Sequence, residues 1–150
     1  MQTFTISRVG GQGDGVAETP QGASVVVGYR LRRADPILRR IYAWVYRVAL
    51  FIFFGLSLRD VDCAAKIFRR SALTDISVES CGAFFSAELL IRLRQAGVSI
   101  AEVGVPHYPR TAGSPTGARL SVIRRAVRDF WALRIGLWVN RTRAMAAGRA

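Results

Sequence analysis

The stretch from Asp60 to Arg70, "DVDCAAKIFRR", holds the residue types in this chain that most readily do chemistry. Asp60 and Asp62 stand two residues apart, and a cysteine, a lysine and a pair of arginines follow them. Residues i and i+2 of an extended segment point the same way, so the two carboxylates can share a divalent cation. Three interpretations are open: a metal-binding Asp-x-Asp site, part of another active site, or a charged loop that leads into a buried strand.

The cysteines and the histidine do not extend this stretch into a zinc centre. Cys63 and Cys81 lie in different segments without C-x-x-C spacing, and the single histidine, His107, has no obvious partner in the sequence. A structural zinc site normally takes four such ligands, so we exclude one. Two free thiols favour a reducing compartment. The opening residues also lack the charged start and apolar core of a secretory signal.

Composition indicates a folded domain with an unusual charge. Of 150 residues, 51% are hydrophobic, which is incompatible with a disordered tail. The formal net charge is +12, from 22 basic and 10 acidic residues, and Lys66 is the only lysine. Guanidinium groups match phosphate oxygens bidentately, so an arginine surplus favours phosphate-bearing ligands or anionic membranes. A GC-rich genome produces the same surplus.

The elements that must position these residues begin after a polar lead-in. Residues 1–23 are rich in Gly, Gln, Thr and Ser, and the "GGQGDG" within them has neither the strand before it nor the helix after it that a phosphate-binding loop needs. The β-branched run "ASVVVGYR" predicts a buried strand. Asp35 and Pro36 predict a helix start, and Gly55 predicts the end of that helix.

Five further elements follow in the sequence. In chain order they are a strand over 64–68, a short helix capped by Ser71, a helix with Ser86 as its cap and Gly97 as its end, a strand over 98–105, and a basic amphipathic helix from about Arg119 to Arg141.

Two of the helices have apolar surfaces with more than one interpretation. The run from Val48 to Phe54 is apolar on every side but far shorter than the roughly 20 residues that span a bilayer. It predicts a buried helix or one that dips into a membrane. The last helix has tryptophans on its apolar side and arginines between them, so it suits a membrane interface, a protein core or a partner.

Four stretches in this order carry a family resemblance: "VVVGYRLRRADPILRRIYAWVY", "GLSLRDVDCAAKIFRRSAL", "SAELLIRLRQAGVSIAEVGV" and "HYPRTAGSPTGA". Together they resemble the second half of family 2 glycosyltransferases of the dolichyl- or polyprenyl-phosphate sugar synthase type. The resemblance implies a GT-A fold, an α/β sandwich whose first half binds a nucleotide-sugar and a metal ion. The second half of that fold contacts the acceptor and the phosphates, and the sugar passes to a lipid phosphate with inversion at the anomeric carbon.

We therefore expect the α/β fold class, as the second half of a GT-A fold with a C-terminal amphipathic helix. The expected divisions are a flexible or artefactual leader over 1–23, the acceptor half over 24–118, and a basic amphipathic helix and tail over 119–150. The lipid phosphate is already ionised, so such an enzyme needs cationic groups that position phosphates more than it needs a strong general base.

The resemblance assigns roles within the opening stretch. "RDVDCAAKIFRR" is similar to the family's later Asp-x-x-Ser-Gly-Phe-Arg/Lys element rather than to its metal-binding Asp-x-Asp. Asp60 takes the acidic position near the acceptor phosphate, with Asp62 as the second candidate for the active-site carboxylate. Lys66 takes the basic position. Cys63 stands where the family has serine, and alanines replace the glycine and the aromatic residue.

Five more candidates follow from the resemblance. Arg30 is a candidate phosphate contact, and Arg39 and Arg40 lie on the helix that follows it. Glu88 lies where related transferases carry a catalytic acid, although its place in the first turn of a helix also suits a carboxylate. Arg110 resembles an arginine of a mobile loop that closes over phosphates.

The donor-binding half of such an enzyme is absent from this sequence. A Mg²⁺ or Mn²⁺ ion is expected for the complete enzyme, with ligands outside this chain. The expected partners are a nucleotide-sugar, a lipid phosphate, a membrane surface and either a separate donor-half chain or a second copy. The expected location is cytoplasmic, at the inner face of the membrane. Without the missing strands, the strand within "ASVVVGYR" is predicted to expose an edge and an apolar face.

Three functions are therefore open. The chain is the acceptor half of a lipid-phosphate glycosyltransferase, inactive in isolation, or a non-catalytic module that binds a membrane surface or a partner. The third, a nucleic-acid-binding protein, has only the net charge in its favour, since no recognition motif is legible. We do not expect nucleic acid as a partner.

Overall fold

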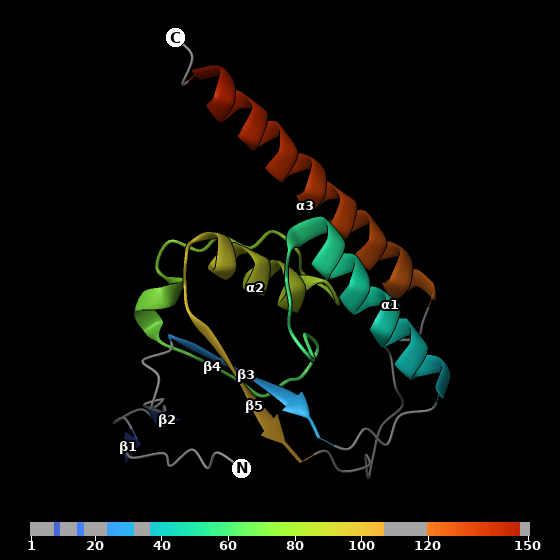
Figure 1. Cartoon of the computed structure of the whole chain (residues 1–150), viewed down its shortest axis with the longest axis vertical. Helices are drawn as coiled ribbons and strands as arrows, with labels where there is room; N and C mark the ends of the chain where they lie inside the picture. The colour runs from blue at the N-terminus through green and yellow to red at the C-terminus, as the bar shows by residue number, and fades with distance from the viewer. Residues whose placement is uncertain (1–7, 10–14, 17–23, 32–36, 107–119, 148–150) are drawn as a thin grey trace.

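The computed structural model describes residues 8–9, 15–16, 24–31, 37–106 and 120–147. They form a mixed α/β fold with a small three-stranded sheet and three helices (Figure 1). The elements are β1 (Arg8–Val9), β2 (Gly15–Val16), β3 (Val25–Arg30), α1 (Ile37–Phe54), β4 (Lys66–Phe68), the 3₁₀ helix η1 (Arg70–Leu73), α2 (Phe85–Gln95), β5 (Ile100–Val105) and α3 (Leu120–Ala147).

Strand β3 lies in the centre of the sheet, in the order β4-β3-β5. It pairs parallel with β5, from Val25 opposite Ile100 to Arg30 opposite Val105, and antiparallel with β4. The expectation that this strand exposes an edge is wrong. Both of its edges are paired, and all three of its valines are buried, because β4 and β5 take the edge positions that we assigned to it.

Helix α1 covers the residues that the sequence predicts for it. Gly55 ends it with φ of +69°, a conformation that glycine adopts without a Cβ clash, and the Gly55 N–H donates to the Phe51 carbonyl. The apolar run at its C-terminal end is only partly in the core. Leu50 is fully buried, whereas Phe51 and Ile52 are exposed. The prediction of a buried helix is therefore wrong for the outer side of this run.

The predicted serine caps are wrong for both later helices. The N-cap residue of α2 is Phe84, so Ser86 lies inside that helix. The N-cap residue of η1 is Arg69, so Ser71 lies inside η1. Neither N-cap residue makes a side-chain hydrogen bond to its helix. The predicted end of α2 is correct, since Gly97 has φ of +74° and Val98 N–H donates to the Leu93 carbonyl.

The core lies where the helices meet the sheet. Val25 and Val27 of β3 pack with Leu50 of α1 and with a row of residues from α2 in one apolar cluster. Phe130 and Leu133 of α3 close the cluster on the side away from the sheet, and Figure 1 shows α3 extending well past the other helices. Helix α3 ends six residues later than predicted, at Ala147 rather than Arg141.

Two findings concern sequence-predicted features at the edges of the fold. Strands β1 and β2, of two residues each, pair antiparallel within the segment that the sequence predicts to be a flexible lead-in.

No helix in the described part of the chain is long and apolar enough to cross a membrane. The loop that holds His107 and Arg110, and the predicted helix start at Asp35 and Pro36, lie outside the described residues.

Candidate functional site

Arg30 and Asp60 form a bidentate ion pair at the C-terminal end of β3. Arg30 Nε donates to Asp60 Oδ2 at 2.5 Å, and Arg30 Nη2 donates to Asp60 Oδ1 at 2.9 Å. Asp60 is buried in the loop that follows α1, and the side chain of Arg30 is only 15% exposed. A charge-assisted fork of this kind fixes the plane of the guanidinium group as well as its position.

Gly28 allows the loop to lie close to β3. Its N–H donates to the Ala65 carbonyl at 2.7 Å. A Cβ on residue 28 would lie 3.0 Å from the Ala65 Cβ and 3.2 Å from Cys63 Sγ, which is tighter than ordinary packing. Ala65 and Cys63 therefore pack directly on the backbone of β3 and hold the loop against it.

Lys66 joins this pair from the start of β4. Its Nζ donates to the Cys63 carbonyl and lies 3.5 Å from Ser86 Oγ of α2. Burial lowers the pKa of Lys66 below its usual value, and the positive charge of Arg30 acts in the same direction. The nearby acidic groups, Cys63, Asp62 and Asp60 in decreasing order, oppose that shift without cancelling it. We call Arg30, Asp60, Asp62 and Lys66 the Asp60 cluster.

Tyr46 of α1 adds a buried hydroxyl next to this cluster. No hydrogen-bond partner for its Oη is found in the described part of the chain. Burial raises the pKa of Tyr46 well above its usual value, and the Asp62 carboxylate raises it further. Sequence reasoning missed Tyr46, although it stands four residues before the buried Leu50 and therefore on the inner face of the helix.

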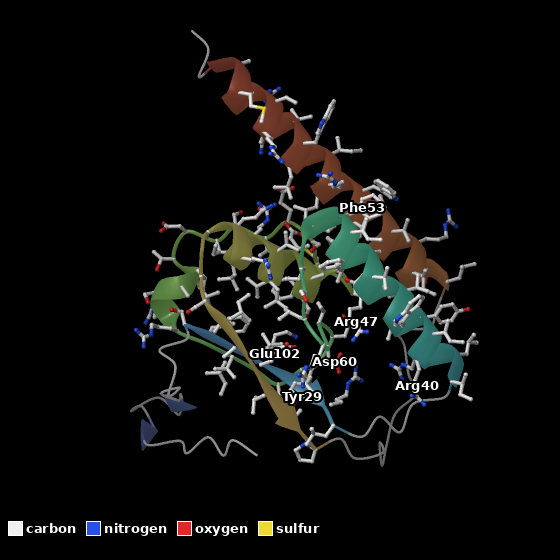
Figure 2. The ribbon with its side chains drawn as sticks, viewed as in Figure 1. Tyr29, Arg40, Arg47, Phe53, Asp60 and Glu102 are labelled. Atoms are coloured by element: carbon white, nitrogen blue, oxygen red, sulfur yellow. The ribbon has the colours of Figure 1, made fainter. Side chains whose placement is uncertain are left out.

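A cavity of about 430 Å³ opens between α1, the loop after it and β5. Arg59, next to Asp60, lies over the Tyr29 ring at 4.7 Å, and its backbone N–H donates to Glu102 Oε1 at 2.7 Å. Figure 2 shows Arg47 of α1 on the side of the helix that faces Asp60 and Glu102. Both polar and apolar side chains line the cavity, namely those of Arg47, Val48, Phe51, Leu56, Ser57, Leu58, Arg59 and Glu102.

Glu88 belongs to a second cluster, between α2 and α3. Its carboxylate accepts hydrogen bonds from the backbone N–H groups of Glu79 and Ser80 and from Arg92 Nε at 2.7 Å. Burial by itself would raise the pKa of Glu88, but the hydrogen bonds from Ser80, Glu79 and Arg92 outweigh it and lower the pKa. We call Glu79, Ser80, Glu88 and Arg92 the Glu88 cluster; its contacts are those of a carboxylate held in its ionised form.

The structure thus gathers only some of the predicted site residues. Arg30, Asp60, Asp62 and Lys66 lie together, and Glu88 lies in the other cluster. Arg39 and Arg40 lie exposed in the first turns of α1. The sequence did not single out Arg47, Arg59 or Glu102, because their convergence depends on how α1 and β5 pack and no local motif marks it.

The described residues do not fit a metal site. No group of three or more His, Cys, Asp or Glu side chains that could hold a metal ion is found among them. Both carboxylate oxygens of Asp60 already accept hydrogen bonds from Arg30, which leaves Asp60 and Asp62 a poor pair for chelation. The Asp-x-Asp at the start of this stretch is better described as the acidic part of an ion-pair cluster.

Comparison with known proteins supports a glycosyltransferase in general. One protein of Mycobacterium bovis and two of Mycobacterium tuberculosis, each named an uncharacterized glycosyltransferase, are 32% identical to this chain over 126 residues. The match covers 77% of this chain and 55% of each relative, so the chain spans about half the length of the curated relatives it matches. No family model and no solved structure matches the chain.

Proposed function

We propose that this chain is the acceptor-binding half of a family 2 glycosyltransferase with a GT-A fold, and that the complete enzyme moves a sugar from a nucleotide-sugar to a polyprenyl or dolichyl phosphate. The residues that bind the donor and a Mg²⁺ or Mn²⁺ ion are supplied by a part of the enzyme outside this chain. The relatives' names support the sugar transfer, and the resemblance of the four sequence stretches supports the acceptor class.

The Asp60 cluster is the observation that carries this proposal. Arg30 and Lys66 bring two cationic groups to one buried carboxylate at the end of β3. Partly buried cations attract an anion more strongly than exposed ones, because less water screens them. Asp60 holds Arg30 in a fixed orientation, so the cations need little rearrangement when a phosphate arrives.

The acceptor's own chemistry agrees with this arrangement. A lipid phosphate is an ionised nucleophile, so the site must position it and offset charge on the leaving diphosphate. Asp60 and Asp62 serve as the active-site carboxylates of this proposal and act by positioning the cations. The amphiphilic cavity beside Asp60 suits a ligand with one charged and one apolar part.

Sugar transfer in a completed enzyme tests the proposal. The part of the M. bovis relative that this chain does not match is joined to residues 24–150, and transfer from nucleotide-sugars to a short-chain prenyl phosphate is measured. Asp60→Asn and Arg110→Ala are each expected to abolish transfer, and Arg143→Ala at the end of α3 is the control. Full activity in both variants would refute the residue assignments. Turnover by the 150-residue chain alone would refute the need for a second part.

A further inference from the structure

Helix α1 has an outer face that nothing in the described structure covers. Eight of its large apolar or aromatic residues are at least half exposed, among them Trp44 at 57% and Ile52 at 67%. A surface helix of a folded domain normally turns polar residues to solvent. On α1 the outward side is apolar from the first turn to the last, and no acidic residue occurs in the helix.

Helix α3 continues this apolar surface. Leu120, Val127, Trp131 and Trp138 are exposed and recur at helical spacing, so they form one stripe along the helix. Trp131 also contacts Phe53 of α1, with the two rings 5.3 Å apart. Figure 1 shows α1 and the first half of α3 running in the same general direction on one side of the molecule. We call these two exposed helix faces the α1–α3 face.

Arginines lie beside and within the α1–α3 face. Helix α1 carries three arginines and α3 carries six, against a single acidic residue, Asp129, which is mostly buried and paired with Arg128. Arg40 and Arg47 are seven residues apart and therefore lie on the same side of α1, the side towards the Asp60 cluster (Figure 2). On α3, Arg124 and Arg134 have the same helical spacing as the exposed apolar stripe, so the face combines apolar and aromatic side chains with arginines.

We propose that the α1–α3 face lies on an anionic lipid bilayer, with both helices in the plane of the interface. Helices of this kind bury their apolar side at the boundary of headgroups and acyl chains, where tryptophan is favoured and arginine meets lipid phosphate. A second copy of the chain fits less well, because a symmetric contact would bring the arginines of the two faces together. This inference does not depend on sugar transfer.

The position of the three tryptophans gives the experiment its readout. The chain has three, Trp44, Trp131 and Trp138, and all belong to the α1–α3 face. Tryptophan emission of the 150-residue chain is recorded with vesicles of phosphatidylcholine alone and with vesicles that contain phosphatidylglycerol. The vesicles contain no prenyl phosphate and no sugar donor, so the result is separate from the test of sugar transfer.

We expect a blue shift with anionic vesicles, quenching by brominated acyl chains, and weaker binding at high salt. Ile41 of α1 and Ile135 of α3 are also exposed, at 50% and 58%. The double variant Ile41→Asp/Ile135→Asp keeps all three tryptophans and is expected to reduce partitioning at least tenfold. Leu73→Asp, a matched change on η1 away from both helices, is expected to leave partitioning unchanged; circular dichroism verifies that each variant is folded.

Three results would overturn the inference. The first is the absence of vesicle binding, and the second is equal loss of binding in the Leu73→Asp control. The third is a blue shift that appears without vesicles and grows with protein concentration, together with a dimer in sedimentation; this result would assign the α1–α3 face to a second copy.

Discussion

The Asp60 cluster and the Glu88 cluster each place a carboxylate against an arginine, but they differ in what completes them. Glu88 accepts two backbone N–H donors and an arginine one turn away on its own helix, so its partners are local and neutralise it. Asp60 is held by Arg30 from a different element, and Lys66 adds a second cation close by. The first arrangement stabilises a helix junction, while the second concentrates cations at the end of a strand.

The largest expected effect is on sugar transfer in the completed enzyme, where a variant of the Asp60 cluster is compared with a variant of the Glu88 cluster. Asp60→Asn removes the charge that orients Arg30 and is expected to abolish transfer, a loss of at least about a hundredfold. Glu88→Gln keeps the shape of the side chain and is expected to act mainly on stability. A comparable loss of transfer in a folded Glu88→Gln protein would remove the distinction and restore Glu88 as a catalytic candidate.

Stability gives the second contrast. Glu88 is 97% buried in its cluster, and removing the charge of one partner from such a pair costs about 3 kcal/mol. We expect Glu88→Gln to lower the urea midpoint clearly in denaturation followed by circular dichroism. Glu79→Gln is the matched control, because the Glu79 side chain is 85% exposed and its pairing with Arg92 contributes little. Similar losses in both variants would contradict the assignment of Glu88 as the structural carboxylate.

The acid limb of stability follows from the same carboxylate. Because the pKa of Glu88 is lower in the folded protein than the ordinary glutamate value of 4.5, the unfolded chain binds more protons as the pH falls. The stabilisation is therefore present above pH 4.5 and is lost as the pH falls through the lower, folded pKa. Urea denaturation between pH 5 and 2.5 is expected to show this slope. An unchanged slope in Glu88→Gln would assign it to other carboxylates.

Lys66 gives a dependence of the same sign on the alkaline side. Burial lowers its pKa below 10.5, so the unfolded chain binds more protons in the interval between the two values. Its contribution to stability therefore rises as the pH increases through that interval, and Lys66→Met is expected to remove this rise. A steeper rise in Lys66→Met would contradict the burial of the ammonium group.

The smallest expected effects come from two glycines that shape the frame of the site. Gly55→Ala places a Cβ at φ of +69° in open space and is expected to cost about 1 kcal/mol. Gly28→Ala instead forces the 63–65 turn away from β3, so it is expected to weaken phosphate binding as well as stability. Unchanged phosphate binding in Gly28→Ala would show that the turn does not position the Asp60 cluster.

The sequence predicts the individual helices and strands of this fold better than it predicts which strands pair with one another. The bounds of α1, the glycine ends of α1 and α2, and the strands β3 and β5 follow from short-range patterns that the structure confirms. The central place of β3 in the sheet does not follow from such patterns, because it depends on pairing with residues about 40 and 75 positions away in the chain.

The candidate site divides in the same way. The stretch from Asp60 to Lys66 is visible as a motif, since its residue types stand close together in sequence. The ion pair with Arg30, the buried hydroxyl of Tyr46 and the cavity wall at Arg47 arise from tertiary packing. The exposed sides of α1 and α3 are apolar in the sequence too, but composition alone does not tell an outward face from a core face.

The most direct test of the central claim uses the only lysine of the chain. Reductive methylation with ¹³C-formaldehyde labels Lys66, and its NMR signal is separated from that of the labelled N-terminus by its pH titration. We predict that a short-chain prenyl phosphate shifts the Lys66 signal and raises its pKa, because a bound phosphate favours the charged ammonium. The corresponding prenyl alcohol is predicted to leave both unchanged. A Lys66 signal that responds to neither compound, or equally to both, would contradict phosphate binding at the Asp60 cluster.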